Sequence, residues 1–326
     1  MKARHWIVSA LALAGAIVWT MRKRPPARPH GRRLDLPASD DTPSSEMGSV
    51  QFIGTATTLI RYQGMTILTD PNFLHRGDHI HLGYGLHSTR LTDPAIDFDQ
   101  LPPIDFVLLS HMHEDHFDRL VAERLPRHTP IVTTRCAARI LHRRGFSAVY
   151  ALRVWDYVMV RKGHVTLRVT SMPGTHGPMI VASALPDVMG SMLDFRNERD
   201  GRKYRMYISG DTLVHNDLHE IPRRYKNIDL ALLHLGGTRV LGILVTMDAK
   251  QGIECLRIIQ PDMAIPIHYN DYDVFRDPLE NFVRAVEQAG LQDKVRYLYH
   301  SESYAFAPRA SGAVARPDLM GAQPLV

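Results

Sequence analysis

Four side chains that can ligate a metal ion lie within six residues of one another. Residues 110–116 read SHMHEDH, which places three imidazoles and a carboxylate directly after the apolar run Phe106–Leu109. Neutral imidazole nitrogen and carboxylate oxygen are ligands that zinc takes, and a loop leaving a strand can turn several of them to one point. A single histidine is more often a core or surface residue. This H-x-H-x-D-H run instead predicts a metal site.

Further candidate ligands share one position, just past an apolar run that predicts a strand. They are Asp70 after Thr66–Thr69, His176 after Val165–Thr170, Asp211 after Arg205–Ile208, and His268 after Met263–Ile265. Each alone is a weak signal, because an aspartate between glycine and threonine is also typical of a turn. In this chain order and together with the histidine run, they predict one site with many ligands.

These motifs resemble those of the metallo-β-lactamase superfamily, the αββα metallohydrolases. The resemblance covers residues 49–306, and all five metal-related motifs of the family have a counterpart here. Within the superfamily, the sequence LPPID at residues 101–105 is similar to the branch that contains the N-acyl-phosphatidylethanolamine-hydrolysing phospholipase D. That branch is related to the ascorbate-phosphate lactonases.

The resemblance implies a pair of zinc ions, although manganese or iron would suit the same nitrogen and oxygen ligands. It assigns His111, His113 and His176 to the first ion, Asp115, His116 and His268 to the second, and Asp211 to a bridge between them. Asp70 would orient a ligand rather than bind the metal.

Such a ligand set implies a mechanism. Two zinc ions about 3.5–4 Å apart share a hydroxide that forms near neutral pH. Asp115 and Asp211 would be catalytic by orienting that hydroxide, while the ions stabilise charge in the transition state. His215 and His234 are candidate proton donors to the leaving group, although packing or surface roles are commoner for such histidines.

We expect a dinuclear zinc-dependent hydrolase that attacks a phosphodiester, and the resemblance extends this to a membrane phospholipid. A lactonase or other ester hydrolase with a soluble substrate is one alternative. A non-catalytic metal-binding scaffold is another. The seven implied ligands favour catalysis, because a structural zinc site is closed by four ligands around one ion.

Two packed sheets flanked by helices, an α+β fold of the αββα sandwich type, would position these residues. Apolar and β-branched runs predict strands at 49–53, 57–62, 65–69, 106–109, 131–133, 148–150, 158–160, 165–170, 180–185, 191–195, 203–209, 230–233, 263–266, 295–299 and 303–306. Helices are expected at 118–125, 215–223, 248–259 and 277–290. Residues 72–100 lack a clear element and are a candidate lid.

Composition narrows the possible functions. The chain has 326 residues, of which 44% are hydrophobic and 22% charged, so wholesale disorder and fibrous repeats are excluded. Two cysteines cannot form a disulfide framework. Eight of the 39 lysines and arginines lie in residues 1–33, where there is no acidic residue. The remainder is slightly acidic, so no nucleic-acid partner is expected.

The N-terminal segment, residues 1–33, is expected to be an uncleaved membrane anchor with a basic flank. The run Trp6–Met21 carries no charge, and the more basic side that follows it places the body on the cytoplasmic face. A signal peptide cleaved during export is the alternative. Residues 34–48 then form a proline-rich linker, 49–307 the hydrolase domain and 308–326 a flexible tail. The expected partners are a small-molecule or lipid substrate and, through residues 1–33, the membrane surface.

Overall fold

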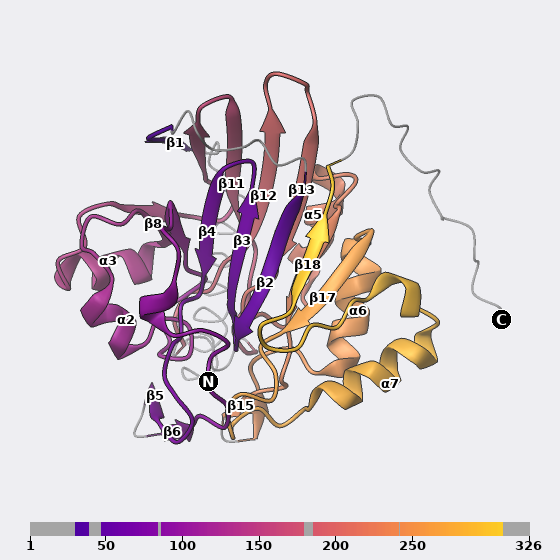
Figure 1. The fold of residues 1–326 in the computed structure, drawn as a ribbon. Helices are drawn as coiled ribbons and strands as arrows, with labels where there is room; N and C mark the ends of the chain where they lie inside the picture. Colours follow the sequence, from indigo (N-terminus) through magenta and orange to yellow (C-terminus); the bar gives the residue numbers. More distant parts are fainter. Residues whose placement is uncertain (1–29, 39–46, 84–85, 179–184, 241, 309–326) are drawn as a thin grey trace, which may run out of the picture. The chain divides into compact units, whose positions relative to one another are not determined.

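The computed structural model describes residues 30–38, 47–83, 86–178, 185–240 and 242–308 (Figure 1). By its internal contacts the chain divides into Met1–His30 and Gly31–Val326, and the elements below all belong to the second unit. The run Trp6–Met21, the strand expected at 180–185 and the tail from 309 lie outside the described residues. Within the described ranges, no helix is both long and apolar enough to cross a membrane.

The first of two large sheets has the strand order β18-β2-β3-β4-β7-β8-β9. These strands are, in that order, Ser303–Phe306, Gly48–Gly54, Thr57–Tyr62, Met65–Thr69, Phe106–Leu108, Ile131–Thr134 and Val149–Leu152. The β3–β4 hairpin turns at Gln63 and Gly64, which both have positive φ, the conformation that matches the twist of the flanking strands. From β4 onward the neighbouring strands are parallel.

The second large sheet has the order β1-β10-β11-β12-β13-β14-β17. Its strands are, in that order, Gly31–Leu36, Tyr157–Lys162, Val165–Met172, Gly190–Asn197, Lys203–Ile208, Leu230–His234 and Met263–Ile267. The strands β13, β14 and β17 are parallel, so their carboxyl ends lie at the same edge. Two short hairpins complete the strands: β5 (His79–Gly83) with β6 (Leu86–Thr89), and β15 (Arg239–Val240) with β16 (Ile243–Leu244).

Helices cover the outer faces of the two sheets (Figure 1). The first sheet packs against α2 (Arg119–Arg124) and α3 (Arg135–Arg143), which bury Val121 and Leu141 in one apolar cluster with that sheet. The second packs against α6 (Ala249–Ile259) and α7 (Leu279–Ala289). Shorter helical turns are η1 (Phe98–Gln100), η2 (Asn216–His219), α5 (Glu220–Arg224) and η3 (Gln292–Lys294). The expected αββα sandwich is confirmed.

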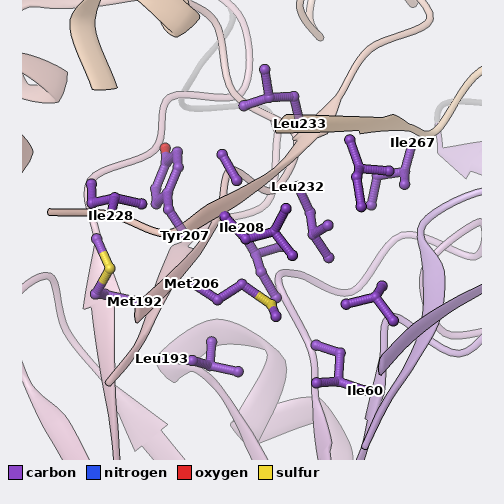
Figure 2. Close-up of a cluster of buried hydrophobic side chains, with 14 of the residues drawn as sticks. Ile60, Met192, Leu193, Met206, Tyr207, Ile208, Ile228, Leu232, Leu233 and Ile267 are labelled. Atoms are coloured by element: carbon purple, nitrogen blue, oxygen red, sulfur yellow. The ribbon is translucent and has the colours of Figure 1, made fainter. Parts of the chain in front are cut away.

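Most of the core lies between the sheets (Figure 2). Side chains alternate along a strand, so Met206 points toward Ile60 of the first sheet while the next residue, Tyr207, points away from it. Both side chains are fully buried. Burial on both faces explains why β14 and β17 read as nearly continuous apolar runs.

Four local expectations were wrong. Residues 31–36 form β1, paired in parallel with β10, where an anchor flank and a linker were expected. The region 72–100 contains the β5–β6 hairpin and a helical turn. The helix α3 was not expected at all. Residues 295–299, expected to be a strand, contain only one isolated bridge at Val295.

Candidate metal centre

The candidate ligands converge because most of them follow the carboxyl ends of parallel strands. Asp70 follows β4 and the histidine run follows β7 in the first sheet, whereas Asp211 and His268 follow β13 and β17 in the second. His176 lies beyond β11 in the second sheet. The two sheets therefore present their ligands toward one another at a shared edge, as expected for polar groups at such strand ends.

One group consists of His111, His113 and His176. The Nδ1 atom of His113 lies 3.0 Å from Nε2 of His111 and 3.2 Å from Nε2 of His176. His176 donates its Nδ1 proton to the carbonyl oxygen of Val245 at 2.9 Å, because that oxygen can only accept. The neutral ring then directs the unprotonated Nε2 toward the other two imidazoles.

The second group consists of Asp115, His116, Asp211 and His268. Nε2 of His268 lies 3.3 Å from Oδ2 of Asp115 and 3.6 Å from Oδ1 of Asp211. Nε2 of His116 lies 3.3 Å from Oδ2 of Asp211. A backbone carbonyl oxygen fixes the tautomer of His268 as well, since its Nδ1 donates to the carbonyl oxygen of Leu235 at 3.1 Å. The four side chains are almost completely buried.

The two groups are adjacent. The imidazole rings of His111 and His116 have centroids 4.1 Å apart, and the charge of Asp211 acts on the pKa of His111 as well as on that of His116. The structure thus brings together all seven side chains that the resemblance implied as ligands.

Asp70 lies behind the second group. Its Oδ2 atom is 3.4 Å from Nδ1 of His116 and 3.4 Å from Nε2 of His234, and its Oδ1 accepts the backbone N–H of Ser110 at 2.7 Å. Asp70 therefore contacts a ligand histidine on the side away from the ligand group. This is the arrangement in which a carboxylate orients a metal-binding imidazole.

The two candidate proton donors occupy different surroundings. His234 is fully buried, with one ring nitrogen facing Asp70 and the other 3.3 Å from the hydroxyl of Ser209. His215 precedes η2, and its Nε2 is buried without a hydrogen-bond partner. Among the described residues, no contact joins His215 to the seven grouped side chains. The surroundings of His234 fit a positioning role.

The pKa values differ between the groups. Burial lowers the pKa values of His111 and His176 and brings that of His113 to about 4, so these imidazoles are neutral and can bind a metal. In the second group burial alone would lower the pKa values of His116 and His268. The charges of Asp211 and Asp115 nevertheless raise both. In the metal-free group the two carboxylates thus favour the protonated imidazoles, and a divalent cation that displaced those protons would meet the same negative charge.

The pKa values of the two carboxylates show the same interaction between the aspartates and the histidines. Burial alone would raise the pKa values of Asp115 and Asp211. The charges of His116 and His268 instead bring that of Asp115 to about 2 and lower that of Asp211 far below its ordinary value. Both aspartates are ionised at neutral pH, and in the metal-free chain His116 and His268 supply the positive charge that such buried anions require.

Unpartnered atoms and spacing show that the residues fit metal ions. Among buried polar atoms, Oδ1 of Asp115, Oδ1 of Asp211 and Nε2 of His116 have no hydrogen-bond partner. Two nitrogens on one tetrahedral zinc, each about 2.0–2.1 Å from it, lie about 3.3 Å apart. The nitrogen spacings in the first group are close to that value. We conclude that the donor set fits one divalent ion in each group.

Two site residues have backbone conformations that non-glycine residues seldom adopt. Asp70 has a φ of 36° and His268 a φ of 63°. The loop after β17 is held by the N–H of His268, which donates to the carbonyl oxygen of Thr55 at 2.6 Å, and by Asp271, which accepts the N–H of Thr55. Such strain at a buried site is typical of functional residues.

Other groups that support the ligands were not predicted. Thr246 donates its hydroxyl to Oδ2 of Asp211 at 3.1 Å, and the carbonyl oxygens of Val245 and Leu235 fix the two histidine tautomers. Carbonyl oxygens are present in every residue, so sequence carries no signal for them. Thr246 is distinguished only by its place beside the β15–β16 hairpin.

Comparisons with known proteins agree with this geometry. Residues 66–269 match the family described as "Beta-lactamase superfamily domain", which is more than half of the chain. A UPF0173 metal-dependent hydrolase of Archaeoglobus fulgidus is 29% identical over 232 residues, which cover 66% of this chain and 91% of that protein.

Two solved structures share the fold. The isothiocyanate hydrolase from Delia radicum gut bacteria has a TM-score of 0.67 and 20% identity, and a possible metal-dependent hydrolase of Veillonella parvula has 0.68 and 19%. Each match covers 79% of this chain and 99% of the other. The chain therefore belongs to the beta-lactamase superfamily, and it is a metal-dependent hydrolase of the metallo-β-lactamase fold.

Proposed function

We propose that the chain is a dinuclear zinc-dependent phosphodiesterase. One observation carries this proposal: two adjacent ligand groups, one of three neutral imidazoles and one that joins two imidazoles to two ionised carboxylates. A structural zinc site would need only four ligands and no second group. The mixed carboxylate and imidazole set also suits manganese or iron, and zinc is proposed because three imidazoles without a carboxylate form the first group.

A pair of divalent cations in such a site supplies Lewis acidity and activates water at neutral pH. The chain's own side chains would hold these ions and orient the attacking water. Asp211 would hold both ions, because it lies against His116 and His268 of the second group and its charge also acts on His111 and His176 of the first. The hydroxyl of Thr246 fixes the orientation of this carboxylate. Asp115 would orient the attacking water through its unpartnered Oδ1.

The leaving group needs a proton, and His215 is the proposed donor. Burial lowers its pKa, so the imidazole is neutral at pH 7 and would give its N–H proton to the leaving group while its other nitrogen takes up a proton. Its Nε2 has no partner within the chain. His234 is better suited to hold Asp70 in place, because both of its ring nitrogens face protein atoms.

A phosphodiester is proposed over a lactone because two adjacent cations can bind both the attacking and the leaving oxygen of an in-line displacement at phosphorus. The membrane phospholipid implied by the sequence resemblance is the proposed natural form of this substrate. Attachment through residues 1–33 to the cytoplasmic face of a membrane belongs to the same proposal. Export after signal cleavage would place the body on the other side.

The test combines metal counting with hydrolysis. The purified chain should contain about two zinc ions and should hydrolyse bis(p-nitrophenyl) phosphate, and a chelator should abolish that activity. A lactone and a p-nitrophenyl carboxylate ester serve as competing substrates. Faster turnover of either would replace the phosphodiesterase with the alternative ester hydrolase. Two bound metals without turnover of any of them would favour a non-catalytic scaffold.

A further inference from the structure

A small cavity beside the metal centre is surrounded by cationic side chains. It has a volume of about 290 Å³ and is lined by Gly237, Arg239, Asp248, Ala249, Lys250, Arg276 and Asp277. The three cations come from different elements: Arg239 from β15, Lys250 from the first turn of α6, and Arg276 from the loop before α7. All three are exposed to solvent at its rim.

The two carboxylates of the cavity offset two of these three charges, but they are held by N–H groups rather than by the cations. Asp248 caps α6 by accepting the N–H of Gln251, and Asp277 accepts the N–H of Ala249 and a side-chain N–H of Asn281. Arg239 donates to the carbonyl oxygen of Gly242. Within the described part of the chain, no ion pair joins any of the three cations to a carboxylate, although the charge of Arg276 acts on Asp273.

The three cations outnumber the two carboxylates of the lining, so the cavity keeps a net positive charge that attracts an anion. Arginine and lysine are the side chains that bind phosphate and carboxylate groups, arginine through two parallel N–H groups and lysine as a point charge. The volume is sufficient for one phosphate group with part of its carrier. The cavity thus has the charge, the donors and the size for a phosphate-like dianion.

Contacts connect this cavity to the metal centre. A Cβ atom added to Gly236, the neighbour of Gly237, would lie 2.5 Å from the carbonyl oxygen of His268. The ring of Phe275, the neighbour of Arg276, lies 4.3 Å from the ring of His268. The segment that carries Arg239 ends at Val245 and Thr246, which hold His176 and Asp211. Residues that line the cavity are thus chain neighbours of residues that contact His268, and this links the cavity to the metal centre.

We propose that Arg239, Lys250 and Arg276 form a subsite for a second anionic group of the substrate, a phosphate remote from the bond that is cleaved. This inference rests on the proposed phosphodiesterase activity for the identity of the substrate, but not for the binding of the anion. Among soluble substrates, it narrows the class to phosphodiesters that carry a further phosphate.

Two substrates that share one scissile bond test the subsite. They are the p-nitrophenyl ester of thymidine 5′-phosphate and the same ester with a further phosphate on the 3′-oxygen. With the zinc-loaded full chain, we expect KM to be about tenfold lower for the second ester. Lys250→Gln or Arg276→Gln should reduce this ratio about threefold to tenfold, the effect of losing one charge-assisted contact.

The matched control is Arg257→Gln, which removes an exposed cation from the same helix outside the cavity. It should keep the wild-type ratio. A wild-type ratio of one, or an unchanged ratio in Lys250→Gln and Arg276→Gln, would overturn the proposal.

Titration with inorganic phosphate separates this proposal from the proposed function. It uses calorimetry in an Asp211→Ala background, in which phosphate binding at the metal centre is weakened. Saturable binding that Lys250→Gln and Arg276→Gln weaken, but Arg257→Gln does not, supports the subsite. No binding, or equal binding in all variants, overturns it. If neither ester is hydrolysed, the phosphodiesterase proposal fails and this titration alone decides on the subsite.

Discussion

Asp211 contacts more of the metal centre than any neighbouring carboxylate. Its two oxygens face His116 and His268, and its charge also acts on His111. Asp211→Ala should therefore lower the metal content at both sites and reduce kcat/KM by roughly two to three orders of magnitude. Elemental analysis and hydrolysis of bis(p-nitrophenyl) phosphate check this, with the exposed Asp293→Ala as control. Two bound zincs and full activity in Asp211→Ala would contradict the dinuclear assignment.

His113 gives the companion test for the first group, because it lies within 3.2 Å of both other imidazoles. His113→Ala should abolish hydrolysis with little change in circular dichroism, since the side chain belongs to a loop rather than to the core. Loss of one zinc rather than both would distinguish it from Asp211→Ala. A fully active His113→Ala would exclude the first group from catalysis.

His234 separates positioning from proton donation. Because its Nε2 faces Asp70, which in turn contacts His116, His234→Ala should weaken zinc binding at the second group about tenfold to a hundredfold. His234→Gln, which retains an N–H donor, should restore part of that affinity. Competition with a chromogenic chelator measures both. If zinc affinity were unchanged while kcat fell, His234 would instead be the proton donor that the sequence also allowed.

Asp271 predicts how stability depends on pH. Burial alone would raise its pKa, but the hydrogen bond and charge of His300 and the charge of Arg90 hold it below its ordinary value. A lowered pKa in the folded state stabilises the fold above the unfolded pKa of about 3.9, and this contribution is lost as the pH falls through the folded pKa. Asp271→Asn should thus cost about 1–3 kcal/mol at pH 7.

Urea unfolding of the metal-free chain at pH 7, 5 and 3 measures this effect. The difference between wild type and Asp271→Asn should persist from pH 7 to 5 and shrink toward pH 3. A difference that stays constant down to pH 3 would show that packing or hydrogen bonding, rather than ionisation, determines the effect of Asp271.

The ligands could be found from sequence for a physical reason. A metal centre needs a few residue types at strand ends, and strand ends are marked where an apolar run stops before Asp70, His111 or Asp211. Hydrogen-bond partners such as Val245 and Leu235 act through main-chain atoms, which any residue supplies. The cavity at Lys250 was invisible for another reason, because its cations are separated by 11 and 26 residues and only the fold brings them together.

Hydrogen bonds join the β5–β6 hairpin to two loops that carry ligands, the loop after β7 and the loop after β17. Glu114, between two ligands, accepts the N–H of His81, and Asp273, five residues after His268, accepts the N–H of Thr89. Arg119 of α2 donates to the carbonyl oxygen of His79 and pairs with Asp78. This location agrees with the predicted lid, whose contact with substrate stays a prediction.

Loosening the hairpin tests the lid. Arg119→Gln removes the contacts of Arg119 to His79, to Asp78 before the hairpin and to Glu114, but none to a ligand side chain. Amide hydrogen exchange of residues 79–89 should therefore increase several-fold and KM should rise. Arg124→Gln is the matched control, because it breaks an exposed ion pair of the same helix with Asp99. Faster exchange with unchanged kinetics would leave the hairpin as a wall that does not touch substrate.

The elements that sequence reasoning missed depend on distant contacts. The strand β1 buries only Leu34 deeply, and its partner β10 lies more than 120 residues away along the chain. Its local sequence therefore resembles a linker. The helix α3 did offer a signal, because Thr134 caps it and Ala137, Ala138 and Leu141 form one buried face. The apolar runs on either side of α3, which predict strands, obscure this helix signal.

At the scale of the whole molecule, charge is distributed unevenly along the chain. The excess of positive charge lies in residues 1–33, of which 31–33 belong to β1, and the uncharged run Trp6–Met21 lies in the same segment. If the natural substrate is a membrane lipid, this segment would raise the effective concentration of the enzyme at the bilayer. If the substrate is soluble, the segment would determine location alone.

A truncation distinguishes these cases, and β1 fixes where it must end. Deleting residues 1–29 leaves Gly31–Leu36 paired with β10, whereas deleting 1–33 would remove half of that strand.

We expect the truncated chain to bind two zincs and to hydrolyse bis(p-nitrophenyl) phosphate within about twofold of the full chain. On vesicles of phosphatidylcholine with N-acyl-phosphatidylethanolamine and phosphatidylserine, its activity should fall at least about tenfold. Added salt should reduce the activity of the full chain on these anionic vesicles, because Arg22, Lys23 and Arg24 lose their attraction to the surface. Equal activity of both chains on vesicles would reject the lipid substrate and direct the search to soluble phosphodiesters that carry the second phosphate which Lys250 and Arg276 would bind.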